Sequence, residues 1–283
     1  MLLTGLALAL TGCGSVSLVY GQGGNLGYWW LDRYVDFNAE QAPRARAALA
    51  DWFSWHRRNA LADDIAWLEQ RADEVAQELT PAQVCAWFDQ LRQRRAAYLA
   101  PLLPATTALA ATLEPRQLEH IAQRQASRND DWRDDHLQPR PADRLDADAK
   151  RIRERAEMFY GRLDAAQRRY IVERLKGNTP WSAERWYADM LADQAALLEA
   201  LRGVARQGPT GPAAAALAAA LQQPGAAADA ATLAWREQLQ AYQCAYTAEL
   251  HRRTTPEQRA NAARTLRGWA QDLRAFLPAA APG

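Results

Sequence analysis

The sequence predicts an all-α protein, an irregular bundle of several long antiparallel helices. Val and Ile are sparse, whereas the common residues, Ala, Leu, Arg, Gln and Glu, are strong helix formers. No stretch alternates β-branched and polar residues over the length that a strand needs. A helix-start pattern recurs along the chain, which at 283 residues is long enough to bury a large core.

The chain begins with a short apolar run that ends in Leu10-Thr11-Gly12-Cys13. Residues 2–11 are too few to cross a bilayer, which takes about 20 apolar residues, and they lack the polar stripe of a packed helix. Small residues ending in Cys directly after such a run resemble the lipobox of bacterial lipoproteins. The resemblance implies a signal peptide over residues 1–12 and a lipid, palmitate, on Cys13. Because Gly14 rather than Asp follows, it also implies an outer-membrane protein that faces the periplasm.

Residues 13–27 are rich in Gly and free of charged side chains, which predicts a flexible tether after the lipidated Cys13. A flexible segment of this length spans about 20 Å on average. An aromatic-rich run, residues 28–37, comes next, and rings this close to a lipid anchor fit the headgroup level of a bilayer. The alternative is a helix that starts the core, which is favoured because large aromatic side chains dominate core burial. That interpretation buries Trp30, Leu31, Tyr34 and Phe37.

Five helix starts carry a capping box, in which a polar N-cap residue accepts a hydrogen bond from the third helical residue and a Gln there bonds back. The N-cap residues are Asn38, Thr80, Glu114, Asp164 and Thr255, with Gln41, Gln83, Gln117, Gln167 and Gln258 three positions on. In three of them Pro follows the cap, where its missing N–H would have no helical partner. Ser182 begins a looser copy.

These starts, together with intervening Pro and Gly residues, predict where the helices lie. We expect helices at 39–78, 81–100, a short one ending near 112, then 115–137, 143–161, 165–176, 183–206, 227–253 and 256–277. A further, Ala-rich helix is expected between breaks at 207–212 and 223–225. Residues 28–206 would form the main helical domain and 207–226 an Ala-, Pro- and Gly-rich break. Residues 227–283 would add C-terminal helices that pack on the main domain.

Charge and cysteine content limit the partners and the compartment. The 34 basic and 33 acidic residues give a net charge of +1, so no global field attracts nucleic acid, and we expect no nucleic-acid partner. Cys85 and Cys244 form a disulfide in an exported protein if their helices are neighbours. Two separately buried thiols are the alternative, because free Cys is among the most buried residue types.

One set of polar residues is the candidate site for an anion or a partner. His56 and Arg57 lie on one predicted helix, and a second predicted helix carries Arg128, Asn129, Trp132 and Arg133. If those helices pack side by side, their guanidinium, amide and indole groups would hold a carboxylate or phosphate. The alternative is a polar network that joins the helices, because polar residues in a helical core usually satisfy one another.

The sequence carries no signature of catalysis or of a metal site. None of the four His has a second His four residues away, HExxH is absent, and no Ser lies in a Gly-x-Ser-x-Gly elbow. We therefore expect no enzyme, no catalytic residue, no metal and no cofactor.

Several stretches together resemble an uncharacterised family of Gram-negative lipoproteins with a domain of unknown function. They are the lipobox, the run Trp-Trp-Leu-Asp-Arg-Tyr-Val-Asp at 29–36, the boxes at Asn38 and Thr80, and the segments Trp55-His56-Arg57-Arg58, Arg128-Asn129 and Trp132-Arg133. The resemblance covers about residues 10–190 and implies a location and an architecture, without an activity. Leu79–Gln83 also matches the LTxxQ motif of small Spy-type periplasmic chaperones, which is a weaker likeness.

These observations favour a non-enzymatic protein-interaction or chaperone-like module. A lipid would hold it in the membrane, and its partner would be a periplasmic or other envelope protein. The alternatives are an anion- or ligand-binding sensor of envelope stress and an enzyme that acts on the cell wall.

Overall fold

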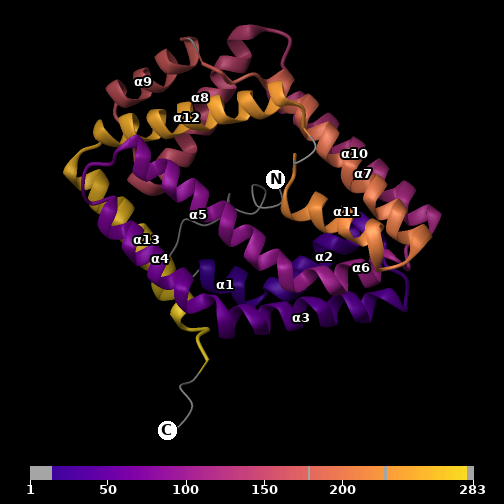
Figure 1. The fold of residues 1–283 in the computed structure, drawn as a ribbon. Helices are drawn as coiled ribbons and strands as arrows, with labels where there is room; N and C mark the ends of the chain where they lie inside the picture. The colour runs from indigo at the N-terminus through magenta and orange to yellow at the C-terminus, as the bar shows by residue number, and fades with distance from the viewer. Residues whose placement is uncertain (1–14, 178, 226–227, 279–283) are drawn as a thin grey trace.

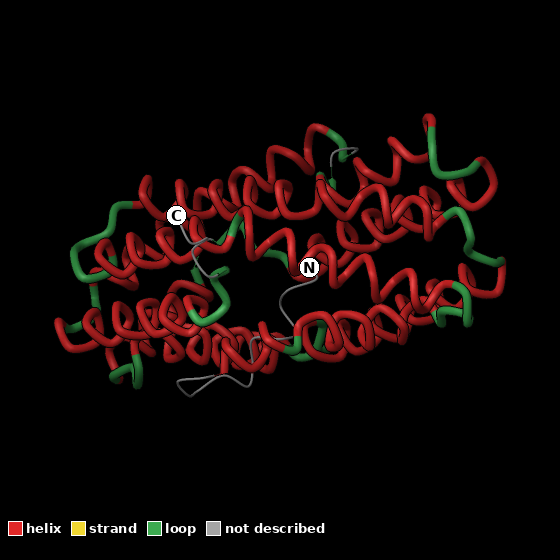
Figure 2. Tube along the Cα trace, turned by 90° about the horizontal axis from the view of Figure 1, so that it is seen from below, coloured by secondary structure: helices red, strands yellow, loops and turns green. Residues whose placement is uncertain are grey.

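The computed structural model describes residues 15–177, 179–225 and 228–278. Throughout these ranges the chain forms helices and no strand, so the predicted all-α multi-helix fold is confirmed. Figure 1 shows the helices arranged as an open frame that one long helix crosses. Seen from below, most helices run along the long dimension of the body (Figure 2).

Each side of the frame is a group of packed helices. One side consists of α4 (Leu61–Glu74) and α13 (Pro256–Arg274), and a second of α8 (Pro141–Tyr160), α9 (Ala165–Lys176) and α12 (Ala230–Arg252). A third consists of α7 (Pro115–His136), α10 (Ala183–Gln207) and α11 (Gly211–Gln222). The fourth consists of α1 (Ser15–Gly21), α2 (Gly23–Val35), α3 (Gln41–Asn59), the short η2 (Ala100–Leu102) and α6 (Leu103–Ala110). The crossing helix is α5 (Pro81–Leu99).

Two of the predicted capping boxes meet at the starts of α3 and α7. The side chains of Gln41 and Gln117 are fully buried, and each amide donates to the other's carbonyl oxygen, at 3.2 and 2.7 Å. Each amide also donates to the carbonyl two positions before the first residue of the other box (Asn38 or Glu114), namely Thr112 for Gln41 and Asp36 for Gln117, both at 2.8 Å. Since each glutamine also accepts from the backbone N–H of the first residue of its own box, the pair fixes two helix starts at once.

The starts of α9 and α13 repeat this arrangement at another corner of the frame. Gln167 and Gln258 exchange amide hydrogen bonds of 2.6 and 3.0 Å. Here too each amide donates to the carbonyl two residues before the other cap, Arg253 at 2.9 Å and Arg162 at 3.0 Å. The same hydrogen-bond scheme therefore joins residues 76 positions apart in one half of the chain and 91 positions apart in the other.

The fifth box, at the start of α5, has no such partner among the described residues. Thr80 and Gln83 form the same reciprocal bonds with each other, but Gln83 is exposed. One chain thus contains buried, paired boxes and an exposed, single one built from the same residue types.

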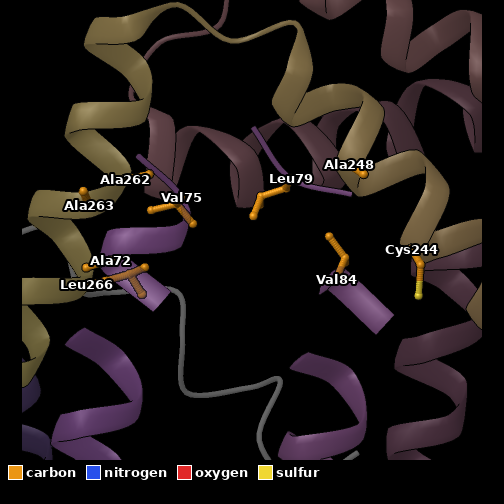
Figure 3. Packing of buried hydrophobic residues seen from close by; sticks show 9 residues of the cluster. All are labelled: Ala72, Val75, Leu79, Val84, Cys244, Ala248, Ala262, Ala263 and Leu266. Carbon is orange, nitrogen blue, oxygen red and sulfur yellow. The ribbon is translucent and has the colours of Figure 1, made fainter. Parts of the chain in front are cut away.

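Buried apolar residues form separate clusters along the frame. One joins α4, α5, α12 and α13 and is rich in small side chains (Figure 3): Ala72, Val75, Leu79, Val84, Cys244, Ala248, Ala262, Ala263 and Leu266. Others lie between α6, α10 and α11, around Val204 and Leu217, and between α8, α9 and α12, around Leu163 and Ile171. Alanines let the paired helices approach closely while keeping the core densely packed.

A disulfide joins α5 to α12. Cys85 and Cys244 are bonded, with Cα atoms 5.3 Å apart, so the alternative of two separately buried thiols is wrong. Further along α5, Gln240 of α12 bonds to its side chains, and Arg95 donates to the last carbonyls of α11. The crossing helix is therefore fixed to two sides of the frame.

The glycine-rich segment that we predicted to be a flexible tether, residues 13–27, is helical from Ser15 onward. Helical hydrogen bonds continue across the junction of α1 and α2, because Gln22 donates to Leu18 and accepts from Leu26. A Cβ atom at Gly23 would lie 2.2 Å from the ring of Phe53 on α3, so glycine is needed for this close approach. Packing against α3 thus overrides the low helix propensity of glycine. Cys13 and the predicted signal peptide, residues 1–12, lie outside the described residues.

One other predicted boundary also differs. The predicted helix 39–78 is divided into α3 and α4, because Ala60 leaves the helical conformation (φ −130°) and Leu61 then packs into the core with Ala270. The Ala-rich helix expected within the segment 207–226 is α11, which packs along α10. Its first residue, Gly211, has a φ of +75°, which favours glycine and sharply redirects the chain.

Candidate functional site

The structure does not bring the two halves of the predicted anion site together. His56 and Arg57 lie at the end of α3, where His56 is buried against α1 and α4. The other predicted residues lie on the second half of α7, which packs against α10. They are Arg128, Asn129, Trp132 and Arg133. Although α3 and α7 start side by side, each then follows a different neighbour.

On α7, the predicted residues have structural partners. Asn129 exchanges two amide hydrogen bonds with Gln194 of α10, at 2.8 and 2.9 Å. Trp132 stacks on Tyr187 of α10, with ring centroids 5.3 Å apart. The two arginines are exposed and pair with aspartates three residues away on the same helix. Asn129 and Trp132 therefore join α7 to α10, as the alternative interpretation of this set requires.

His56 belongs to a different cluster, which links three helices. The Tyr20 hydroxyl of α1 lies 2.9 Å from His56 Nδ1, and His56 Nε2 lies 3.1 Å from Asp64 Oδ2 of α4. A carboxylate only accepts, so Nε2 carries the proton and Nδ1 accepts from the tyrosine. Tyr98 and Arg94 of α5 donate to the other oxygen of Asp64.

This tyrosine–histidine–aspartate series has the order of a catalytic relay, but its surroundings make it a structural connection. The rings of Trp52, Phe53 and Phe276 pack around it, with centroids 5.0–5.6 Å from Tyr20 or His56. Burial raises the pKa of Tyr20 to about 12, so the hydroxyl stays protonated at neutral pH and donates to the imidazole. The cluster holds α1 against α3 and α4.

A second tyrosine–histidine pair lies between α8 and α12. The Tyr160 hydroxyl is 2.9 Å from His251 Nδ1, and His251 Nε2 is 2.7 Å from the carbonyl oxygen of Gln77. Burial lowers the pKa of His251, which keeps the imidazole neutral. Like His56, this histidine uses both ring nitrogens to connect helices.

The predicted aromatic run divides between the body and the surface. Tyr28, Leu31, Tyr34 and Phe37 are partly buried, whereas Trp29 is 57% and Trp30 38% exposed, which corrects the expectation that Trp30 is core. Leu18 and Leu26, 68% and 40% exposed, extend this surface along α1 and α2. We call Leu18, Leu26, Trp29, Trp30 and Arg33 the α1–α2 face.

A shallow groove of about 280 Å³ lies between α8 and α9. Three basic side chains line it, Lys150, Arg153 and Arg168, and the adjoining surface of α9 adds further basic groups. Lys150 and Arg153 each have a glutamate 3.9 Å away, one turn along α8. The groove is therefore a partly neutralised basic surface that is open to solvent.

Within the described ranges, no group of three or more His, Cys, Asp or Glu is placed to hold a metal ion. None of the helices described is long and apolar enough to cross a bilayer.

Sequence reasoning missed the partners of His56 and the pairing of the glutamines. Tyr20 lies in the segment that its glycines marked as a tether, and nothing local distinguishes Asp64 from other acids. The α1–α2 face did carry a signal, because Leu26, Trp29, Trp30 and Arg33 have the spacing of one side of a helix.

Comparison with known proteins identifies a family and nothing further. The model of the family of unknown function DUF6279 matches residues 33–227 of this chain. No curated protein and no solved structure matches it.

Proposed function

Because the chain belongs to DUF6279, a family of unknown function, its own residues have to indicate its role, and we propose that it is a lipid-anchored, non-enzymatic helical protein of the bacterial envelope. It binds another envelope protein, in the manner of a chaperone or a docking module. Cys13 carries the lipid, and the body faces the periplasm from the outer membrane.

The observation that supports a non-enzymatic role is the use of reactive side chains as connections between helices. His56 and His251 engage both ring nitrogens, and His120 and His136 each bond a backbone carbonyl. The buried glutamines likewise bond one another and the backbone. Side chains that are hydrogen-bonded between helices stabilise a rigid body. A rigid body suits a protein whose surface binds a partner.

The disulfide supports the location. A bridge between Cys85 and Cys244 is typical of proteins that work in an oxidising compartment, as the periplasm is. The disulfide agrees with the lipobox at Leu10–Cys13, a signal that directs the chain to the same compartment.

Replacing Cys13 tests the anchor. We expect the parent chain, expressed in a Gram-negative host, to incorporate labelled palmitate and to fractionate with the outer membrane. Cys13→Ala should lose both properties, because the acyl chains hold the protein in the bilayer. The double variant Cys85→Ala/Cys244→Ala is the matched control and should keep the label. A Cys13→Ala chain that is processed and fractionates as the parent does would refute the anchor.

Site-specific photo-crosslinking in intact cells tests the partner. In the described chain, three leucines are exposed on helices other than α1 and α2, namely Leu91, Leu191 and Leu233. A photo-reactive amino acid at these positions should give discrete adducts with an envelope protein, whereas the same group at the exposed, charged Arg128 should not. If none of the leucine positions gives an adduct and the protein leaves the aggregation of unfolded clients unchanged, the interaction role is wrong.

An anion- or ligand-binding sensor is the weaker alternative. The residues of the predicted anion site are divided between α3 and α7. An anion would therefore have to bind in the groove between α8 and α9. The open shape of that groove and its neighbouring glutamates favour the interaction role instead.

A further inference from the structure

Exposed apolar side chains are concentrated at one place on the surface. Eight large hydrophobic residues are exposed in the described part of the chain, and four of them lie on α1 and α2: Leu18, Leu26, Trp29 and Trp30. A fifth, Leu277, follows Phe276, whose ring packs against Gly21 and Tyr20 of α1. Exposed apolar side chains gathered on one segment in this way mark a site of interaction with a protein or a membrane.

The residues of the α1–α2 face point to one side of a nearly continuous helix. From Ser15 to Val35 this helix is about 30 Å long at 1.5 Å per residue. With about 100° between successive residues, Leu18, Leu26, Trp29, Trp30 and Arg33 share one side. Asp32 is the only acidic residue in this segment, and it is partly buried and accepts from the backbone of Phe37.

The opposite side of the helix is fixed to the body, so the face is held in place. Phe53 packs against Gly23, Leu49 packs against Gly27, and Tyr20 bonds His56. Arg46 of α3 lies over the ring of Tyr28, 3.8 Å from its centroid. The helix that carries the outward side chains is therefore fixed before any partner arrives, which lowers the entropic cost of binding.

We infer that the α1–α2 face lies on the surface of the bilayer and forms a second membrane contact beside the lipid. This inference rests on the proposed lipidation of Cys13. A single residue, Gly14, separates Cys13 from the start of α1, so the anchor and the face are at the same end of the same segment.

The chemistry of the face also suits a lipid surface. Indole rings are enriched at the headgroup level, where their apolar body and polar N–H both find partners. The Arg33 guanidinium lies 4.8 Å from the Trp29 ring centroid and adds a positive charge that suits anionic headgroups. An interfacial helix together with an acyl chain gives a more stable attachment than either alone.

Quenching of tryptophan fluorescence by brominated lipid tests this inference. The lipidated parent protein is reconstituted in vesicles of phosphatidylethanolamine and phosphatidylglycerol, with and without bromine on the acyl chains. We expect bromine to quench part of the parent's emission. In Trp29→Gln/Trp30→Gln that quenched part should be lost, while circular dichroism and thermal unfolding stay as in the parent. Leu191→Gln/Leu233→Gln removes two exposed apolar residues elsewhere and should be quenched as the parent is.

The outcomes separate this inference from the proposed anchor. If the lipidated, vesicle-bound parent has the same tryptophan emission with and without brominated lipid, the membrane contact is wrong. The proposed lipid anchor is then unaffected. A photo-reactive group at Trp29 that couples to an envelope protein rather than to lipid also overturns the membrane contact. If the chain proves not to be lipidated, quenching on simple mixing with vesicles, lost in the double tryptophan variant, supports the contact and overturns the anchor alone.

Discussion

Gln117→Ala should lower the free energy of unfolding by about 3–5 kcal/mol and the melting temperature by roughly 10 °C. The substitution removes both hydrogen bonds between Gln117 and Gln41, which keeps its bonds to Thr112 and to the Asn38 backbone. It also takes a partner from the Asp36 carbonyl and from the Glu114 N–H, one at each helix start. It also leaves a cavity, because Gln117 is fully buried. Thermal and urea unfolding followed by circular dichroism measure the change.

Gln83→Ala is the matched control for this prediction. Gln83 occupies the same position of the same capping box, but it is exposed and has no glutamine partner in the described chain. Its removal should cost no more than about 1 kcal/mol, the value of a helix cap. The double variant Gln41→Ala/Gln117→Ala should cost less than the sum of its single variants, since neither partner is then left alone. Equal losses for Gln117→Ala and Gln83→Ala would show that the pairing contributes nothing.

Breaking the Cys85–Cys244 bridge should lower the free energy of unfolding by about 4 kcal/mol. The two cysteines are 159 residues apart, so the bond restricts a large loop of the unfolded chain. We expect a reductant to lower the melting temperature of the parent to that of Cys85→Ala/Cys244→Ala, and to leave the double variant unchanged. A parent that migrates equally with and without reductant in a denaturing gel would show that the bridge does not form.

Helix starts could be predicted closely from the sequence, because a cap is a local device. The starts predicted at residues 81, 115, 165, 183 and 256 are the first residues of α5, α7, α9, α10 and α13. An N-cap residue and the side chain three positions on need only each other to form. The hydrogen bonds of these boxes are thus determined within four residues of the chain.

Features that depend on distant contacts could not be predicted. Nothing in the box around Gln41 shows that it pairs with Gln117 whereas Gln83 stays single. The division at Ala60 has no Pro or Gly to mark it, and depends on how Leu61 packs with Ala270. The helix over residues 15–35 has a poor intrinsic propensity and depends on close contacts such as that of Gly23 with Phe53.

The candidate anion site depends on distant contacts in the same way, because it requires the helices around His56 and Arg128 to run side by side. The two helices share only their starts, and His56 instead meets Asp64 across the kink at Ala60. A single sequence predicts which residues a helix contains, but it does not predict which other helix packs against them.

The diagonal course of α5 has a mechanical consequence (Figure 1). A four-sided frame without a diagonal deforms by shear, because its corners act as hinges. Here a helix bonded to α12 at Cys85 and to the end of α11 through Arg95 connects two sides and resists that deformation. A load applied to one side of the frame would therefore move the body as a unit instead of folding it at its corners.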